Sequence, residues 1–117
     1  MEQKGLDKNT ISAALNNLSS SGNTEKTKET SVTGSTTGFH VYAVNWTAEK
    51  IEFSIDGVVF YTYNTTVKTN ENLPYNASPF IILNLVMGGS LEGDIPADFT
   101  ESKMEIDYVR IYRQKTS

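Results

Sequence analysis

Two runs of alternating residues flank an Asp-Gly pair near the middle of the chain. Residues 51–55 alternate isoleucine or phenylalanine with glutamate or serine, and residues 58–63 are rich in valine, tyrosine and phenylalanine. Between them lies Asp56-Gly57, and an Asp-Gly pair between such runs is the strongest short-range signal for a β-hairpin. We therefore predict a hairpin over residues 51–63, which commits this part of the chain to an antiparallel sheet.

Four further segments have the composition of strands. Residues 10–17 alternate apolar and polar side chains, as in a half-buried strand, and residues 39–46 are apolar on both faces, as in a strand inside a sheet. Residues 80–87 are almost wholly apolar, and residues 104–112 carry aromatic and β-branched side chains. Six short strands without helical periodicity predict an all-β fold, an antiparallel β-sandwich or jelly roll. Six strands are few for two closed sheets, so we expect the sandwich to be incomplete.

Polar segments connect these strands. Residues 19–38 combine serine, threonine and glycine with a charge cluster at 25–29, which predicts a long polar surface loop. Residues 64–79 contain two prolines and are also expected to be loop. At 117 residues, the chain has room for one hydrophobic core and therefore one domain.

Composition excludes several classes of function. The net charge of −4 argues against binding to a nucleic-acid backbone, and no apolar run reaches the roughly 18 residues of a membrane-spanning helix. The chain has no cysteine, so disulfides, thiolate metal sites and cysteine nucleophiles are excluded. With His40 as the single histidine, a histidine-rich metal site is excluded as well.

Asn84 and Asp107 are polar residues inside apolar strand patterns. A buried amide without a partner costs roughly 1–3 kcal/mol, so Asn84 either makes an internal hydrogen bond or lies on a face that is not the core. On such a face it could bind sugar hydroxyls as donor and acceptor. Asp107 could be solvated, pair with Arg110, or bind a hard cation such as calcium.

Four segments in series resemble one family. Their order and sequence are similar to those of glycoside hydrolase family 16, the laminarinase and lichenase group, and the segments are residues 39–47, 50–58, 82–89 and 104–112. The resemblance implies a concanavalin A-like jelly roll whose concave sheet binds β-glucan. It also implies that residues 1–117 are the C-terminal part of a single domain of this family.

The same resemblance implies roles for four residues. The family's catalytic motif is Glu-Ile-Asp-Ile-Met-Glu, and the register places its last two residues on Met1-Glu2. Glu2 then matches the general acid/base, while the nucleophilic glutamate would lie before Met1. Asn84 and Asn16 match positions that line the cleft, and Asp107 matches a structural calcium ligand whose companions would again lie outside this chain. No cofactor is required for the chemistry.

We therefore expect a fragment of a retaining endo-β-glucanase that acts on β-1,3 or mixed β-1,3/1,4 glucans and is inactive alone, because the mechanism needs two carboxyl groups. The alternatives are a non-catalytic, lectin-like sandwich and a plain interaction domain. The expected partner is β-glucan polysaccharide, with neither nucleic acid nor membrane, and the uncovered sheet face could support association. The family resemblance implies an extracellular or periplasmic location.

Overall fold

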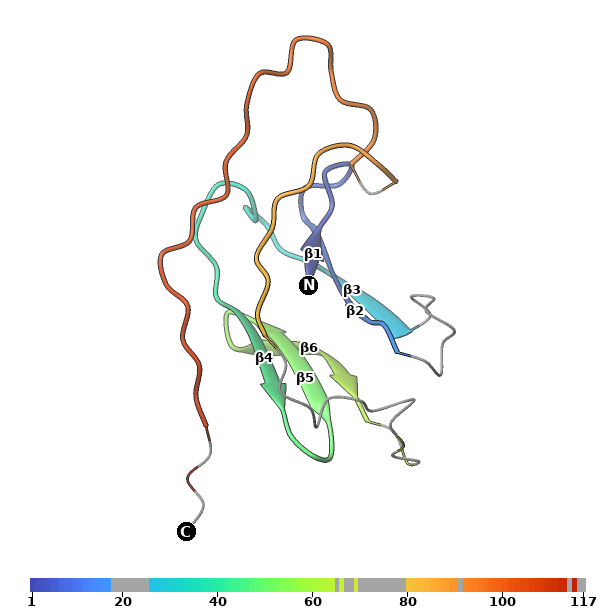
Figure 1. The fold of residues 1–117 in the computed structure, drawn as a ribbon, viewed down its shortest axis with the longest axis vertical. Coiled ribbons are helices and arrows are strands. Elements are labelled where there is room, and N and C mark those ends of the chain that lie inside the picture. The colour runs from blue at the N-terminus through green and yellow to red at the C-terminus, as the bar shows by residue number, and fades with distance from the viewer. Residues whose placement is uncertain are drawn as a thin grey trace.

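The computed structural model describes residues 1–17, 26–64, 66, 69, 80–90, 92–113 and 115. Within these residues the chain forms strands and no helix. The first sheet has the order β1-β2-β3, and the second has the order β4-β5-β6 (Figure 1). The strands are β1 (Glu2–Gln3), β2 (Thr10–Leu15), β3 (Lys26–Ser31), β4 (Tyr42–Trp46), β5 (Ile51–Ile55) and β6 (Val58–Tyr63). All neighbouring strands are antiparallel, as the sequence predicted for this all-β fold.

The β5–β6 hairpin confirms the prediction made from Asp56-Gly57. Ile55 pairs with Val58, so Asp56 and Gly57 alone form the turn. Their φ angles are 51° and 80°, the positive values that a two-residue turn of type I′ requires. A bulge between Phe53 and Ser54 shifts the register of the two strands by one residue further along the hairpin.

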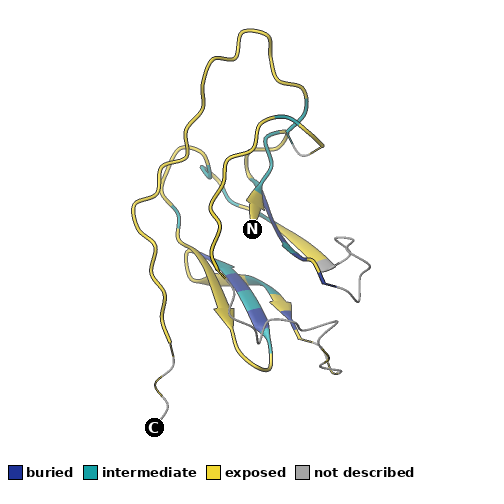
Figure 2. Cartoon of the chain, viewed as in Figure 1, coloured by how far each residue is buried: buried dark blue, intermediate teal, exposed yellow. Residues whose placement is uncertain are grey.

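The core lies between the two sheets. Ala13 and Leu15 of β2 pack with Ile51 and Phe53 of β5 and with Tyr63 of β6. Each of these side chains is buried, and fully burying a leucine, isoleucine or phenylalanine contributes roughly 1.5–3 kcal/mol. The buried stripe that results is visible on β2 and β5 in Figure 2. The sandwich is therefore held together by the inner faces of these two central strands.

The prediction of a loop over residues 19–38 is wrong for six residues. Residues 26–31 form β3, which pairs with the whole of β2 from Leu15↔Lys26 to Thr10↔Ser31. Along the described strands β3 is at the edge of its sheet, where polar and charged side chains remain in water while the backbone pairs. Composition alone does not separate such a strand from a loop. Residues 18–25 lie outside the described part of the chain.

The position predicted for residues 39–46 also needs correction. The strand is shorter, beginning at Tyr42, and it is at the edge of the described β4-β5-β6 sheet instead of inside it. All five residues of β4 are exposed, whereas β5 occupies the centre. β4 therefore carries apolar side chains on both faces, but the described residues bury neither face.

Residues 80–87 and 104–112 are not assigned as strands, contrary to the sequence prediction. Both segments are described, and neither joins a ladder with a described strand. In Figure 1 they run as long traces without arrows, the first in golden orange and the second in red. A strand pattern in the sequence becomes a strand only when a neighbour supplies hydrogen-bond partners, and the described residues supply none here.

None of the described residues belongs to a helix that is long and apolar enough to cross a bilayer.

Candidate active site

Glu2 lies on the outer face of the first sheet. It pairs with Ser12 of β2, whose hydroxyl donates a hydrogen bond of 3.5 Å to the Glu2 carbonyl oxygen. Paired residues of an antiparallel ladder point to the same face, and alternation puts Ile11 and Ala13 on the opposite face, in the core. The Glu2 side chain is exposed, so its carboxyl group can reach a ligand on this face.

Asn16 shares this face by the same alternation. It follows β2 directly and lies four positions after Ser12, an even offset, so it extends the row formed by Ser12 and Ala14. Its side chain is exposed. Four residues along a strand correspond to about 13 Å, so Glu2 and Asn16 lie at separate points along one surface. The structure thus brings two of the predicted cleft residues to one side of one sheet.

The loop after β1 holds the register of the strand that carries Glu2. The Lys4 amide donates to the Thr10 carbonyl at 3.2 Å, and the Thr10 amide donates to the Asp7 carbonyl at 2.9 Å. The Gln3 side-chain amide donates to the carbonyl oxygens of Lys4 and Lys8, at 2.9 and 3.1 Å. A strand of two residues has few ladder bonds of its own, and these contacts supplement them.

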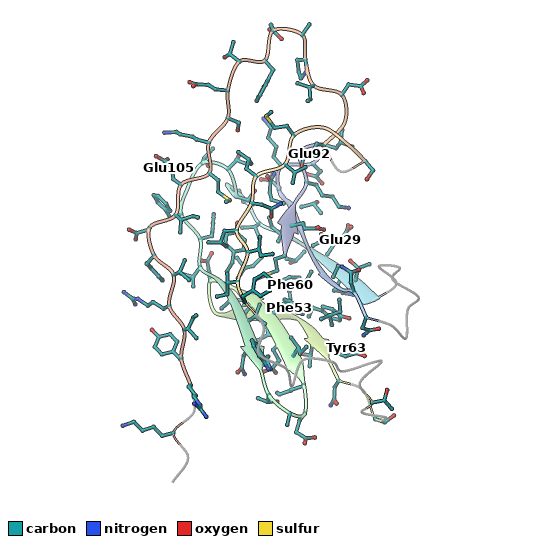
Figure 3. The ribbon with its side chains drawn as sticks, in the orientation of Figure 1. Glu29, Phe53, Phe60, Tyr63, Glu92 and Glu105 are labelled. Carbon is teal, nitrogen blue, oxygen red and sulfur yellow. The ribbon has the colours of Figure 1, made fainter. Side chains whose placement is uncertain are left out.

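A turn that contains Gly88, Gly89 and Gly93 packs against this loop. A Cβ on Gly5 would overlap the Glu92 carboxyl group, and a Cβ on Gly93 would lie 2.8 Å from the Leu6 side chain. Figure 3 shows Glu92 beside the end of the molecule where β1 turns into β2. Each loop therefore places a side chain over a glycine of the other, a contact that the sequence analysis missed. The close spacing of Gly88, Gly89 and Gly93 is the signal that could have indicated a tight turn here.

Asn84 is exposed and lies on residues 80–87. Because this segment pairs with no described strand, no ladder fixes the position of Asn84 relative to Glu2 and Asn16. Its role in the cleft stays a prediction.

Asp107 is exposed as well. Its neighbour Arg110 has its guanidinium carbon 4.2 Å from the centre of the Tyr108 ring, a cation–π arrangement. Among the described residues, no ion pair involves Asp107, and no group of three His, Cys, Asp or Glu residues could hold a metal ion. Calcium takes six to eight oxygen ligands, so the described residues do not by themselves form a calcium site around Asp107.

A second group of hydrogen-bonded polar side chains lies at the other sheet. His40 Nδ1 is 2.7 Å from Asp56 Oδ2, and His40 Nε2 is 3.3 Å from the Gly34 carbonyl oxygen. The Val41 amide donates to Asp56 Oδ1 at 2.8 Å. The hydrogen bond to Asp56 raises the pKa of His40, and the same bond lowers the pKa of Asp56. Because Gly34 follows β3 and Asp56 begins the β5–β6 turn, His40 connects loops of the two sheets.

Comparison with known proteins identifies the family to which this sequence is similar. The sequence pattern of the family described as Glycosyl hydrolases family 16 matches residues 1–110. The chain is 34% identical over 90 residues to glucan endo-1,3-beta-glucosidase A1 of Niallia circulans, covering 66% of this chain and 12% of that protein. It is 31% identical over 84 residues to a beta-glucanase of Rhodothermus marinus, covering 66% of this chain and 29% of the relative.

A solved structure shows the same architecture. The laminarinase of Flavobacterium sp. UMI-01 superposes with a TM-score of 0.61 at 37% identity, over 65% of this chain and 33% of the laminarinase chain. The fold is thus that of a carbohydrate-acting jelly roll. More particularly, this chain belongs to glycosyl hydrolases family 16. It spans a third or less of the length of these relatives.

Proposed function

We propose that this chain is part of a retaining endo-β-glucanase that hydrolyses β-1,3 or mixed β-1,3/1,4 glucans. The proposal is carried by the match to family 16 over residues 1–110, and the similarity to a glucan endo-1,3-beta-glucosidase and a beta-glucanase supports a glucan substrate. The same proposal assigns the protein to an extracellular or periplasmic location, where it would meet polymeric glucan.

Glu2 is proposed as the general acid/base. A retaining glycosidase needs two carboxyl groups about 5–5.5 Å apart, one to attack the anomeric carbon and one to protonate the leaving oxygen. Glu2 is exposed on the outer face of the first sheet, where a polysaccharide could approach it. Proton donation requires Glu2 to carry a proton when the glycosidic bond breaks, and its carboxylate then accepts a proton from the attacking water.

Asn16 and Asn84 are proposed as substrate contacts. An amide side chain offers two N–H donors and a carbonyl acceptor, which suits the hydroxyl groups of a sugar ring. The position of Asn16 on the same face as Glu2 supports this role. For Asn84 the support is its exposure and its place in a segment that matches the family.

The chain alone is proposed to be inactive, because the matched segment supplies Glu2 without a partner carboxylate assigned to attack the sugar. We expect the purified chain to release no reducing sugar from laminarin or lichenan. Turnover by this chain would contradict the proposal.

The activity itself is tested in a chimera. The third of the Flavobacterium laminarinase that superposes on this chain is replaced by the corresponding residues of this chain, and laminarin hydrolysis is measured. We expect hydrolysis, and a loss of at least about 100-fold when Glu2 is changed to Gln, which cannot transfer the proton. A folded chimera that binds laminarin without hydrolysing it would favour the lectin-like alternative.

A further inference from the structure

Glu2, Ser12 and Glu29 form one row across the outer face of the first sheet. Glu2 of β1 pairs with Ser12 of β2, and Ser12 in turn pairs with Glu29 of β3. Paired residues of an antiparallel ladder point to the same face, so the Glu29 carboxyl group shares the face of the proposed acid/base. Adjacent strands lie about 4.8 Å apart, so the backbones of Glu2 and Glu29 are about 10 Å apart. Glu29 is labelled on β3 in Figure 3.

An ion pair crosses the middle strand beside this row. Lys4 follows β1, and its amide donates to the Thr10 carbonyl, so it continues the ladder two residues beyond Glu2. The even offset puts the Lys4 side chain on the outer face, about 7 Å from Glu2 along the backbone. Its ammonium group forms an ion pair and a hydrogen bond with Glu29 Oε1. Lys4 and Glu29 therefore bridge β1 and β3 over β2.

The ion pair lies close to the sheet and still reaches solvent. Ser12 points outward but is only 5% exposed, so neighbouring side chains lie over this part of β2. The Lys4 side chain is 26% exposed and the Glu29 side chain is 51% exposed. Lysine often lays its carbon chain along a surface while its ammonium group stays in water. A ligand on the outer face can therefore contact both charged groups.

The pair offers a sugar both kinds of hydrogen-bonding group. An ammonium group has three N–H donors, and a carboxylate has two acceptor oxygens. The bond between Lys4 and Glu29 uses one donor and one oxygen, so the others can bond to sugar hydroxyls, which donate and accept. Such bonds to charged groups are stronger than those between neutral groups. Hydroxyl side chains continue the outer face along β2 and β3, at Thr10, Thr27 and Ser31.

The same pair is unfavourable for an anionic ligand. With both carboxyl groups ionised, Glu2, Glu29 and Lys4 carry two negative charges and one positive charge, and Glu29 already occupies the lysine. A sulfate or carboxylate group on the sugar would meet these carboxylates without finding a cation that lacks a counter-ion. The Debye length is about 8 Å in physiological salt, so repulsion at contact distance is only partly screened.

We propose that Lys4 and Glu29 form a specificity-determining subsite, which binds the hydroxyl groups of an unsubstituted sugar unit and disfavours units that carry sulfate or carboxylate groups. The substrate is therefore a neutral β-glucan and not an anionic derivative of one. This inference rests on the function proposed above, because it takes the outer face of the first sheet as the substrate face.

The test compares the binding of laminarin and of carboxymethyl laminarin to the 117-residue chain by isothermal titration calorimetry. We expect laminarin to bind at least about 10-fold more tightly, and we expect this preference to shrink as salt is added. Glu29→Gln keeps the shape of the side chain but removes its charge and leaves Lys4 without a counter-ion. This variant should lower the preference by about 10-fold, the effect of one hydrogen bond to a charged group. Lys4→Gln should raise it, because both carboxylates then remain without the ammonium group.

Glu52→Gln is the matched control. Glu52 pairs with Lys50 at 2.6 Å on the second sheet, and its replacement removes one negative charge, as Glu29→Gln does. Circular dichroism first establishes that each variant is folded, and the control should keep the preference of the original chain. Equal shifts from Glu29→Gln and Glu52→Gln would overturn the proposal, because net charge would then set the preference. A chain that binds both polysaccharides equally, or neither, would overturn it as well.

The chimera described above separates this inference from the proposed function. If the chimera fails to hydrolyse laminarin but the binding preference follows Lys4 and Glu29, the proposed activity is rejected and the subsite stands. If the chimera hydrolyses laminarin and carboxymethyl laminarin at equal rates, the subsite is rejected and the proposed activity stands.

Discussion

At the scale of single residues, the loop after β1 and the turn that contains Gly93 pack closely because Gly5 and Gly93 have no side chains. Gly5 does not adopt a positive φ angle, so its importance lies in the space that the Glu92 carboxyl group occupies. A Cβ at Gly5 would also lie 3.3 Å from the Glu92 Cα. The family resemblance predicts Glu2 and Asn16 as site residues, but the sequence does not indicate this contact, because the two loops are far apart in the chain.

Gly5→Ala should destabilise the chain by about 1 kcal/mol, the usual cost of a forced shift in a packed contact. Most of that cost should disappear in the Gly5→Ala, Glu92→Ala double variant, because the nearest group has been removed. Chemical unfolding of the four chains of this cycle measures the coupling. Equal costs of Gly5→Ala with and without Glu92 would contradict the contact.

His40 should titrate above its ordinary pKa of 6.5, because Asp56 stabilises the imidazolium by a hydrogen bond. The stability that His40 contributes is therefore complete below pH 6.5 and is lost as the pH rises through the raised value. The pKa of Asp56 is lowered from 3.8, so its contribution is present above pH 3.8 and is lost as the pH falls through the lowered value. The pair is thus fully formed in mildly acidic solution.

Nuclear magnetic resonance can follow this titration directly, because the chain contains one histidine. Asp56→Asn is the matched variant, since asparagine also tolerates positive φ and keeps the turn while losing the charge. We expect the pKa of His40 to fall toward 6.5 in that variant. An unchanged pKa would mean that Asp56 is not the group that stabilises the charged imidazole.

At the scale of secondary-structure elements, the sequence predicts the structures that depend on a few adjacent residues and misses those that depend on a distant partner strand. The β5–β6 turn was predicted from Asp56-Gly57, because positive φ at two adjacent positions strongly restricts the residue types. The polar strand β3 was missed, because its pairing with β2 depends on a distant partner and its side chains carry no apolar alternation. The apolar segment 80–87 was predicted as a strand for its composition, but pairing again depends on residues elsewhere.

Gly57→Ala isolates the cost of the turn conformation. Gly57 has φ of 80°, and nothing lies within 4 Å of the position of an added Cβ, so backbone strain is the only penalty. We expect the variant to lose about 1–2 kcal/mol in free energy of unfolding. Thermal and urea unfolding measure this loss, and Gly38→Ala, at a glycine without positive φ, is the control. Equal stability of the two variants would contradict the turn geometry.

At the scale of the whole molecule, the all-β class and the family could be predicted from sequence, whereas the arrangement of the candidate site could not. Glu2 and Asn16 share a face because the register of β1 and β2 is set by the loop between them. Asn84 and Asp107 lie on segments without a described ladder, so their positions depend on whatever pairs with those segments. The sequence therefore predicts candidate residues, whereas the distances between them depend on strand pairing that the sequence does not show.

Both sheets are built from strands that follow one another along the chain, β1-β2-β3 and then β4-β5-β6. Meanders of this kind close short loops, and short loop closures are fast. On a ribosome, the first sheet can form while the second is still being synthesised, and both can form before residues 104–112 leave the exit tunnel. Both sheets can therefore form before the exposed apolar residues of 104–112 are synthesised. This order shortens the time in which these residues are exposed on an unfolded nascent chain that can aggregate.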